Sequence, residues 1–306
     1  MSAVINRFNR FNPGRPGRPA PSSKLWRLGL ALLAIALLPL TPLAGRAGVE
    51  PLPLPRASTA NLSRYPNLKP YDLGTLSFTQ PGVAAPWQTM PLPLTGVIGL
   101  PHGAGPWPWV VIWHGRHGGC HFAPEGKSQW PCPAGEETRY DQGFAYLAQA
   151  LTEAGYGVLI PNLNGAFSDT YGATPQTRSL LADQRSQALV DAHLSQLAIA
   201  NQGQSTGFGL SLNGLVDWSR LAMVGHSMGG GAAALNAFHR QGRSSAAEIQ
   251  AGLGPVAALV LVSPTRSYPI QQGAEVYQLA DSPTAVLLGG CDRDIVDLSS
   301  FYYFET

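Results

Sequence analysis

An apolar run that ends at a glycine and is followed at once by a serine most constrains the fold of this chain. Residues 221–224 are apolar, the pattern Gly225-His-Ser-Met-Gly229 follows them, and a segment of Gly and Ala comes next. A Gly-x-Ser-x-Gly pattern between a strand and a helix is typical of a nucleophile elbow, a strained turn that exposes the serine hydroxyl above the sheet. The glycines let strand and helix approach without a Cβ clash. Ser227 is therefore the candidate nucleophile.

Strand and helix signals alternate along the rest of the chain. Alternating apolar positions at 71–79 and 91–100 predict an antiparallel pair at a sheet edge. Continuous apolar runs predict buried strands at 109–113, 156–161, 256–262 and 284–288, and helical spacing predicts helices at 140–154, 177–200 and from the elbow to about residue 240. This alternation implies right-handed crossovers and a mainly parallel sheet covered on both faces. The predicted fold class is α/β, with the α/β-hydrolase architecture over residues 71–306.

The first 47 residues differ in composition from the rest of the chain. Lys and Arg occur there without any Asp or Glu, an apolar stretch spans 28–40, and Gly45-Arg-Ala47 is a small-x-small cleavage candidate. These features predict an export signal, hence a periplasmic or extracellular protein. We favour cleavage because the apolar stretch is shorter than the ~20 residues of a bilayer span, and the long basic segment before it leaves an uncleaved membrane anchor as the alternative. Residues 48–70 are Pro-rich and predict a linker.

Charge limits the classes of binding partner, and cysteine content bears on the cellular compartment. Without the leader the chain is mildly acidic, which gives no electrostatic basis for nucleic-acid binding, and a membrane contact is expected only through the leader. Cys120 and Cys132 are close enough in sequence to close a short surface loop as a disulfide, which is compatible with export. Cys291 is then left over.

The segment after the strand at 109–113 contains several potential metal ligands. The run His114-Gly-Arg-His-Gly-Gly-Cys-His121 resembles a ligand cluster. Structural zinc sites usually pair two separated ligand knuckles, and this chain has one, so we predict neither a metal nor a cofactor. We interpret the segment as an oxyanion loop. Backbone N–H groups of Met228, after the nucleophile, and of Arg116 would then hold the oxyanion.

A serine nucleophile also needs a base and an acid that orients the base. The acid is expected beyond the strand at 284–288, where Asp294 is followed by apolar residues that can anchor it and Asp292 is the alternative. In this fold the order is Ser, acid, His. The last histidine, however, is His239. We therefore expect an incomplete domain, lacking its last strand, helix and catalytic histidine, with His117 or His121 as substitutes; we expect His226 to pack beneath the turn.

Several motifs together resemble one family. They are Trp113-His-Gly-Arg-His-Gly-Gly-Cys120, Trp130-Pro-Cys-Pro133, Gly155-Tyr-Gly157, Asp217-Trp-Ser-Arg-Leu221, Gly225-His-Ser-Met-Gly-Gly230 and Cys291-Asp-Arg-Asp-Ile-Val-Asp-Leu298. They look like bacterial exported α/β-hydrolases, a group similar to cutinase-like polyester hydrolases and to relatives of chlorophyllase and platelet-activating-factor acetylhydrolase. The resemblance implies an esterase with Ser227 as nucleophile, Arg116 and Met228 as oxyanion donors and Asp294 as acid.

The leading hypothesis is a serine hydrolase that cleaves carboxylic esters, small or polymeric, through an acyl-enzyme on Ser227. The alternatives are an inactive or truncated protein of this fold that only binds a ligand, and a peptidase or thioesterase, since the fold does not select the acyl group. Tryptophans near the oxyanion loop suggest an apolar or aromatic acyl group, although such residues more often serve packing; they are Trp107, Trp109, Trp113 and Trp130. The sequence identifies neither the substrate nor the oligomeric state.

Overall fold

The computed structural model describes residues 3–6, 62–120, 130–267, 279–289 and 299–303. Its strands are β1 (Ala3–Asn6), β2 (Leu68–Thr79), β3 (Thr89–Gly99), β4 (Trp107–Trp113), β5 (Gly157–Pro161), β6 (Val216–His226), β7 (Ala258–Val262) and β8 (Thr284–Leu288). The helices are α2 (Ala145–Glu153), α3 (Arg178–Asn201), α4 (Met228–Arg240) and α5 (Ala246–Gln250), with short 3-10 helices η1 (Leu62–Arg64), η2 (Tyr140–Phe144) and η3 (Ser299–Tyr303).

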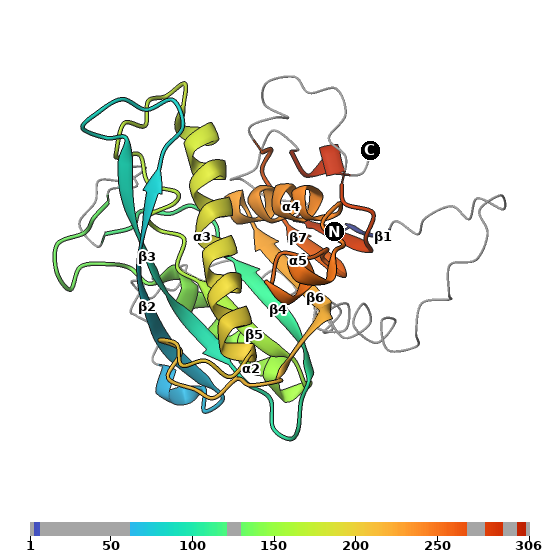
Figure 1. The fold of residues 1–306 in the computed structure, drawn as a ribbon. Helices are drawn as coiled ribbons and strands as arrows, with labels where there is room; N and C mark the ends of the chain where they lie inside the picture. Colours follow the sequence, from blue (N-terminus) through green and yellow to red (C-terminus); the bar gives the residue numbers. More distant parts are fainter. Residues whose placement is uncertain (1–2, 7–61, 121–129, 268–278, 290–298, 304–306) are drawn as a thin grey trace, which may run out of the picture. The chain divides into compact units, whose positions relative to one another are not determined.

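The strands form one mixed sheet in the order β1-β8-β7-β6-β4-β5-β3-β2 (Figure 1). β4 to β8 run parallel to one another, while β2 and β3 form the predicted antiparallel pair at one edge and β1 pairs antiparallel with β8 at the other. Because β3 is antiparallel to β5, the β2–β3 turn lies at the edge where the parallel strands have their carboxyl ends. The loops after β4, β5 and β6 therefore meet this turn at one edge of the sheet.

Both faces of the central strands are covered. Alternate residues of β4, Trp109 and Val111, share one core cluster with buried side chains of α3 and α4. Val110 and Ile112 point to the opposite face and are also fully buried. Helix α2 packs against β5 and β3, and its buried residues lie outside that cluster. The apolar run of β4 is thus continuous because both of its faces are buried, as expected for a central parallel strand.

The structure confirms the predicted α/β-hydrolase fold class and the predicted strands and helices, with small shifts of their ends. The helix predicted for 140–154 begins as η2 and becomes α-helical at Ala145. β2 begins at Leu68, inside the range interpreted as linker. The predicted leader lies outside the described residues apart from β1. In the part of the chain that the structure describes, no helix has both the length and the apolarity to cross a membrane.

Candidate active site

Ser227 lies between β6 and α4 with the strained backbone that its motif predicts. Its φ of 54° and ψ of −127° belong to a region that residues with a side chain rarely adopt, at a cost of about 1–3 kcal/mol. Four backbone hydrogen bonds hold this conformation. The Ser227 N–H donates to the Val262 carbonyl (3.0 Å), and the Ser227 carbonyl accepts from the N–H groups of Gly230 (2.9 Å), Thr265 (3.1 Å) and Gly231 (3.3 Å). Ser227 is largely buried, with 8% of the residue's area exposed.

Glycines bring three segments into contact around Ser227. A Cβ on Gly229 would lie 2.3 Å from the His114 carbonyl oxygen, and one on Gly225 would lie 2.6 Å from the Gly229 carbonyl oxygen. On the loop after β4, a Cβ on Gly115 would lie 2.9 Å from the Ser227 Cβ. Contacts this short leave no room for any side chain. The loop that starts at His114 therefore runs directly against the elbow, as an oxyanion loop must.

The two predicted oxyanion donors flank this contact. Met228 is the first residue of α4, where backbone N–H groups have no partner within the helix. Arg116 follows Gly115, and its guanidinium forms an ion pair with Asp169 in the loop after β5. Backbone N–H groups at a helix N-terminus and in an adjoining loop suit a developing negative charge. The oxyanion roles of Met228 and Arg116 remain predictions that this placement supports.

His114 is a structural residue of the oxyanion loop. Its Nε2 accepts a hydrogen bond from the Leu163 N–H (2.8 Å), so its Nδ1 carries the proton and donates to the Gly115 carbonyl (2.8 Å). Burial lowers the pKa of His114 to about 4 and keeps the ring neutral. With both nitrogens engaged, His114 cannot serve as a base, and it ties the loop after β4 to the loop after β5.

Two other histidines lie beside the elbow. His117 is exposed, with its ring centroid 4.5 Å from that of Tyr140 and 6.3 Å from that of His226, on which it stacks. His226 is half-buried and also neighbours Phe144. We expected His226 to pack beneath the turn, and the structure places it next to the oxyanion loop instead. His193 lies in α3 with its ring packed against that of Tyr71. Burial lowers the pKa of His193 to about 4.

Several predicted site residues lie outside the described residues. They are both acid candidates, Asp294 and Asp292, the histidine substitute His121 and the left-over Cys291. Among the residues that are described, no group of three or more His, Cys, Asp and Glu side chains is arranged to hold a metal ion.

The predicted disulfide between Cys120 and Cys132 is present, with the two Cα atoms 5.4 Å apart. It joins the end of the oxyanion loop to the segment that contains Trp130 and Pro131. Cys120 also forms an antiparallel β-bridge with Glu137, and this bridge ties the end of the oxyanion loop to the segment before η2. The disulfide therefore holds a tryptophan close to the loop that contacts the elbow.

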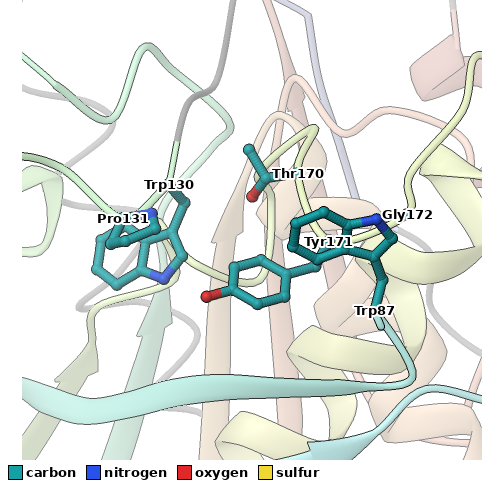
Figure 2. A pocket seen from close by; sticks show the side chains of 6 residues that line it. All are labelled: Trp87, Trp130, Pro131, Thr170, Tyr171 and Gly172. Carbon is teal, nitrogen blue, oxygen red and sulfur yellow. The ribbon is translucent and has the colours of Figure 1, made fainter. Parts of the chain in front are cut away.

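The same edge of the sheet carries a pocket that the sequence did not predict. It has a volume of about 430 Å³ and is lined by Trp87, Trp130, Pro131, Thr170, Tyr171 and Gly172 (Figure 2). These residues come from the β2–β3 turn, the segment at the disulfide and the loop after β5. Of them, Trp130 had been singled out in the sequence, whereas Trp87 and Tyr171 had not. Their only sequence signal is that aromatic residues occur in segments rich in Gly, Pro and Thr.

No protein-family model matches this chain, and no curated protein does. Solved structures do. A putative carboxylesterase from Lactobacillus plantarum WCFS1 is 15% identical, with a TM-score of 0.42 over 78% of this chain and 83% of that chain. Dienelactone hydrolase from Anabaena variabilis ATCC 29413 is 17% identical, with a TM-score of 0.38 over 74% and 79%. A hyperthermophilic esterase from the archaeon Pyrobaculum calidifontis is 19% identical, with a TM-score of 0.36 over 68% and 48%.

Proposed function

We propose that this chain, which has the α/β-hydrolase fold, is a serine hydrolase that cleaves carboxylic esters. The observation that carries the proposal is the strained conformation of Ser227 at the carboxyl end of a central strand, in contact with the loop that starts at His114. Strain of this kind persists at functional sites because the surrounding structure holds it. Here the surrounding structure holds it through backbone hydrogen bonds and through close approaches at Gly115, Gly225 and Gly229.

In this mechanism the Ser227 Oγ attacks the ester carbonyl carbon and its proton passes to a base. The negative charge that develops on the carbonyl oxygen is held by the backbone N–H groups of Met228 and Arg116. The C–O bond of the ester then breaks, the alcohol leaves with a proton from the base, and the acyl group remains on Ser227. Water attacks this acyl-enzyme and releases the carboxylic acid.

The acid and base of this mechanism are proposed with different support. Asp294 is the proposed acid, with Asp292 as the alternative, on the basis of sequence position alone. The base is a histidine. Among the described histidines, His114, His117 and His226 lie beside the elbow. Both ring nitrogens of His114 are engaged, and His226, adjacent to the nucleophile, is poorly placed to reach its hydroxyl. His117, an exposed residue of the oxyanion loop, is therefore the described residue to test as base.

Fluorophosphonate labelling and hydrolysis of p-nitrophenyl esters test the proposal together. Ser227→Ala should abolish both. Ser263→Ala is the matched control, because Ser263 directly follows β7 at the same edge and also has a positive φ, of 42°. Labelling that persists in Ser227→Ala would refute the proposed nucleophile. Labelling without ester turnover would favour the peptidase or thioesterase alternative, and neither signal in the wild type would favour a ligand-binding protein. His117→Ala should lower labelling only if His117 is the base.

We also propose that the protein is exported. The basic and apolar leader supports this proposal, and the Cys120–Cys132 disulfide is of a kind that persists in oxidising compartments. Cell fractionation followed by N-terminal sequencing checks it. A new N-terminus close to Ala47 in the exported fraction is the expected result, whereas an intact leader in the membrane fraction would indicate an anchor.

A further inference from the structure

We propose that the pocket between Trp87, Trp130 and Tyr171 binds an aromatic ring of the substrate. This inference rests on the proposed ester hydrolysis and specifies its substrate class. Among the described residues, the pocket wall contains two indole rings, a phenol ring, a proline and a single aliphatic hydroxyl, with no charged side chain. Such a lining favours a neutral, flat, apolar group over a charged or strongly polar one.

The aromatic side chains are arranged around an open space. Trp87 and Tyr171 meet edge to face, with ring centroids 5.5 Å apart and ring planes at 82°. Figure 2 shows the Tyr171 ring between the two indoles, with its hydroxyl directed toward Trp130 and Pro131. Trp87 is 49% exposed, an unusual amount for so large an apolar side chain. An aromatic ring placed against Trp87 and Tyr171 would bury surface that now faces solvent.

A buried arginine holds one wall of the pocket in place. Arg185 of α3 is fully buried and donates from Nη1 to the Ser168 carbonyl (2.9 Å) and from Nη2 to the carbonyls of Thr170 (3.0 Å) and Tyr171 (3.2 Å). Its Nε donates to the Gln80 side chain (2.7 Å). A guanidinium offers its donors in a fixed planar fork, so these bonds define the path of the loop. The wall is therefore rigid before any ligand arrives.

Gln80 extends this support to the opposite side of the pocket. Its Nε2 donates to the carbonyls of Trp87 (2.6 Å) and Tyr171 (2.9 Å), so one side chain connects the two aromatic residues through their backbones. Tyr171 has a φ of 52°, which a residue with a side chain adopts only when its surroundings impose it. The strain places the Tyr171 ring in the pocket, and the buried Arg185 and Gln80 maintain it.

Two connections join the pocket to the elbow. Asp169, which precedes Thr170 of the pocket wall, forms the ion pair with Arg116 of the oxyanion loop. The Cys120–Cys132 disulfide joins the end of that loop to the segment of Trp130 and Pro131. A ring in the pocket would thus contact residues fixed to the segment that receives the ester carbonyl. This continuity is the basis for proposing that the occupant is part of the substrate rather than a separate ligand.

Ester pairs that differ only in one ring test the inference. Ethyl 3-phenylpropanoate and ethyl 5-phenylpentanoate are compared with their cyclohexyl counterparts, so that the leaving group and the ester stay the same. We expect a higher kcat/KM for the phenyl member of a pair. Trp87→Ala should lower this preference about three- to tenfold, because an aromatic contact contributes that much beyond its area. Trp87→Phe should retain most of it.

Tyr146→Ala is the matched control, because Tyr146 of α2 is also a large exposed aromatic residue, at 62%, and lies outside the pocket. An unchanged preference in Trp87→Ala, with full activity, would overturn the inference while leaving the ester hydrolase intact. An equal loss for phenyl and cyclohexyl members would also overturn it, since it would indicate a general packing effect. Circular dichroism confirms that each variant is folded.

A binding measurement separates failure of the inference from failure of the proposed function. Saturation-transfer NMR with benzyl alcohol and cyclohexylmethanol is carried out on Ser227→Ala, which needs no turnover. We expect transfer to benzyl alcohol that falls in the Ser227→Ala, Trp87→Ala double variant. If the wild type hydrolyses no ester but this transfer is seen, the proposed function fails and the pocket still takes an aromatic ring. If esters are hydrolysed and no transfer is seen, the inference fails.

Discussion

The elbow and the pocket wall lie at the same edge of the sheet, but they are held in opposite ways. At the elbow the strained Ser227 is fixed by backbone hydrogen bonds and by contacts at three glycines. At the pocket wall the strained Tyr171 is fixed by side chains that come from distant segments, Arg185 and Gln80. We therefore expect an added side-chain atom to disrupt the elbow, and the loss of a hydrogen-bond donor to disrupt the pocket wall. Each region has a characteristic substitution that breaks it.

The largest effect is expected from Arg185→Met, which removes the guanidinium donors from the pocket wall at nearly constant size. The carbonyls of Ser168, Thr170 and Tyr171 would lose the bonds that Arg185 donates, and Tyr171 would keep only its bond from Gln80, at a cost of about 4 kcal/mol in the free energy of unfolding. Arg185→Lys should restore little, because an ammonium cannot reproduce the planar fork. Urea denaturation measures the change. Arg178→Met, at an exposed position on the same helix, is the control, and an equal response of the two variants would contradict the comparison.

The corresponding change at the elbow is Gly229→Ala. Its Cβ would lie 2.3 Å from the His114 carbonyl oxygen and 2.6 Å from the Trp113 carbonyl oxygen, so the backbone has to move. We expect a loss of about 3 kcal/mol in the free energy of unfolding, together with loss of fluorophosphonate labelling. Gly143→Ala is the control, because a Cβ there meets nothing within 4 Å. A Gly229→Ala variant as stable and as reactive as Gly143→Ala would show that the elbow can accommodate a Cβ at residue 229.

This difference explains which parts could be predicted from the sequence. The elbow is a local pattern, in which the strand, the glycines and the serine are consecutive, so its position and its strain were predictable. The mainly parallel sheet followed from the alternation of elements, and the disulfide from a short spacing. The pocket wall depends on a hydrogen bond between Gln80 and Arg185, which are 105 residues apart. Arg185 looks like an ordinary helical arginine, because nothing near it in the chain indicates that it is buried.

His114 connects the two regions, and its protonation provides a pH test of that connection. Its pKa is about 4 when folded and ~6.5 when unfolded, so protonation favours the unfolded chain. The contribution of neutral His114 to stability is fully present above pH 6.5 and is lost as the pH falls toward 4, by up to about 3 kcal/mol. His193, also with a pKa of about 4, has the same sign.

Urea denaturation of the wild type and of His114→Gln at several pH values measures this contribution. We expect the free energy of unfolding of the wild type to decrease more steeply between pH 6.5 and 4 than that of His114→Gln. The difference in slope isolates His114 from carboxyl groups and from His193, which titrate in both proteins. Equal slopes would mean that His114 accepts a proton in the folded state without breaking the link between the loops after β4 and β5.

The smallest effect on stability is expected at the ion pair between Arg116 and Asp169, which is the side-chain link between the oxyanion loop and the pocket wall. Both side chains are partly exposed, at 21% and 33%, so Asp169→Asn should change the free energy of unfolding by less than about 1 kcal/mol. The preference for phenyl over cyclohexyl esters should fall as well. Without the pair, the pocket wall keeps its bonds from Arg185 and Gln80 but loses its ion pair with the oxyanion loop, so its position relative to Ser227 is less fixed.

We therefore expect Asp169→Asn to reduce the preference for phenyl over cyclohexyl esters about two- to threefold while the protein remains folded. A double-mutant cycle with Trp87→Ala decides whether the link acts through the pocket. If it does, Asp169→Asn adds little once Trp87 has been removed, because there is no longer a ring contact to position. Additive effects on kcat/KM for both ester types would mean that Asp169 acts on the oxyanion loop alone. The elbow and the pocket wall would then be neighbours at one edge of the sheet without being parts of one site.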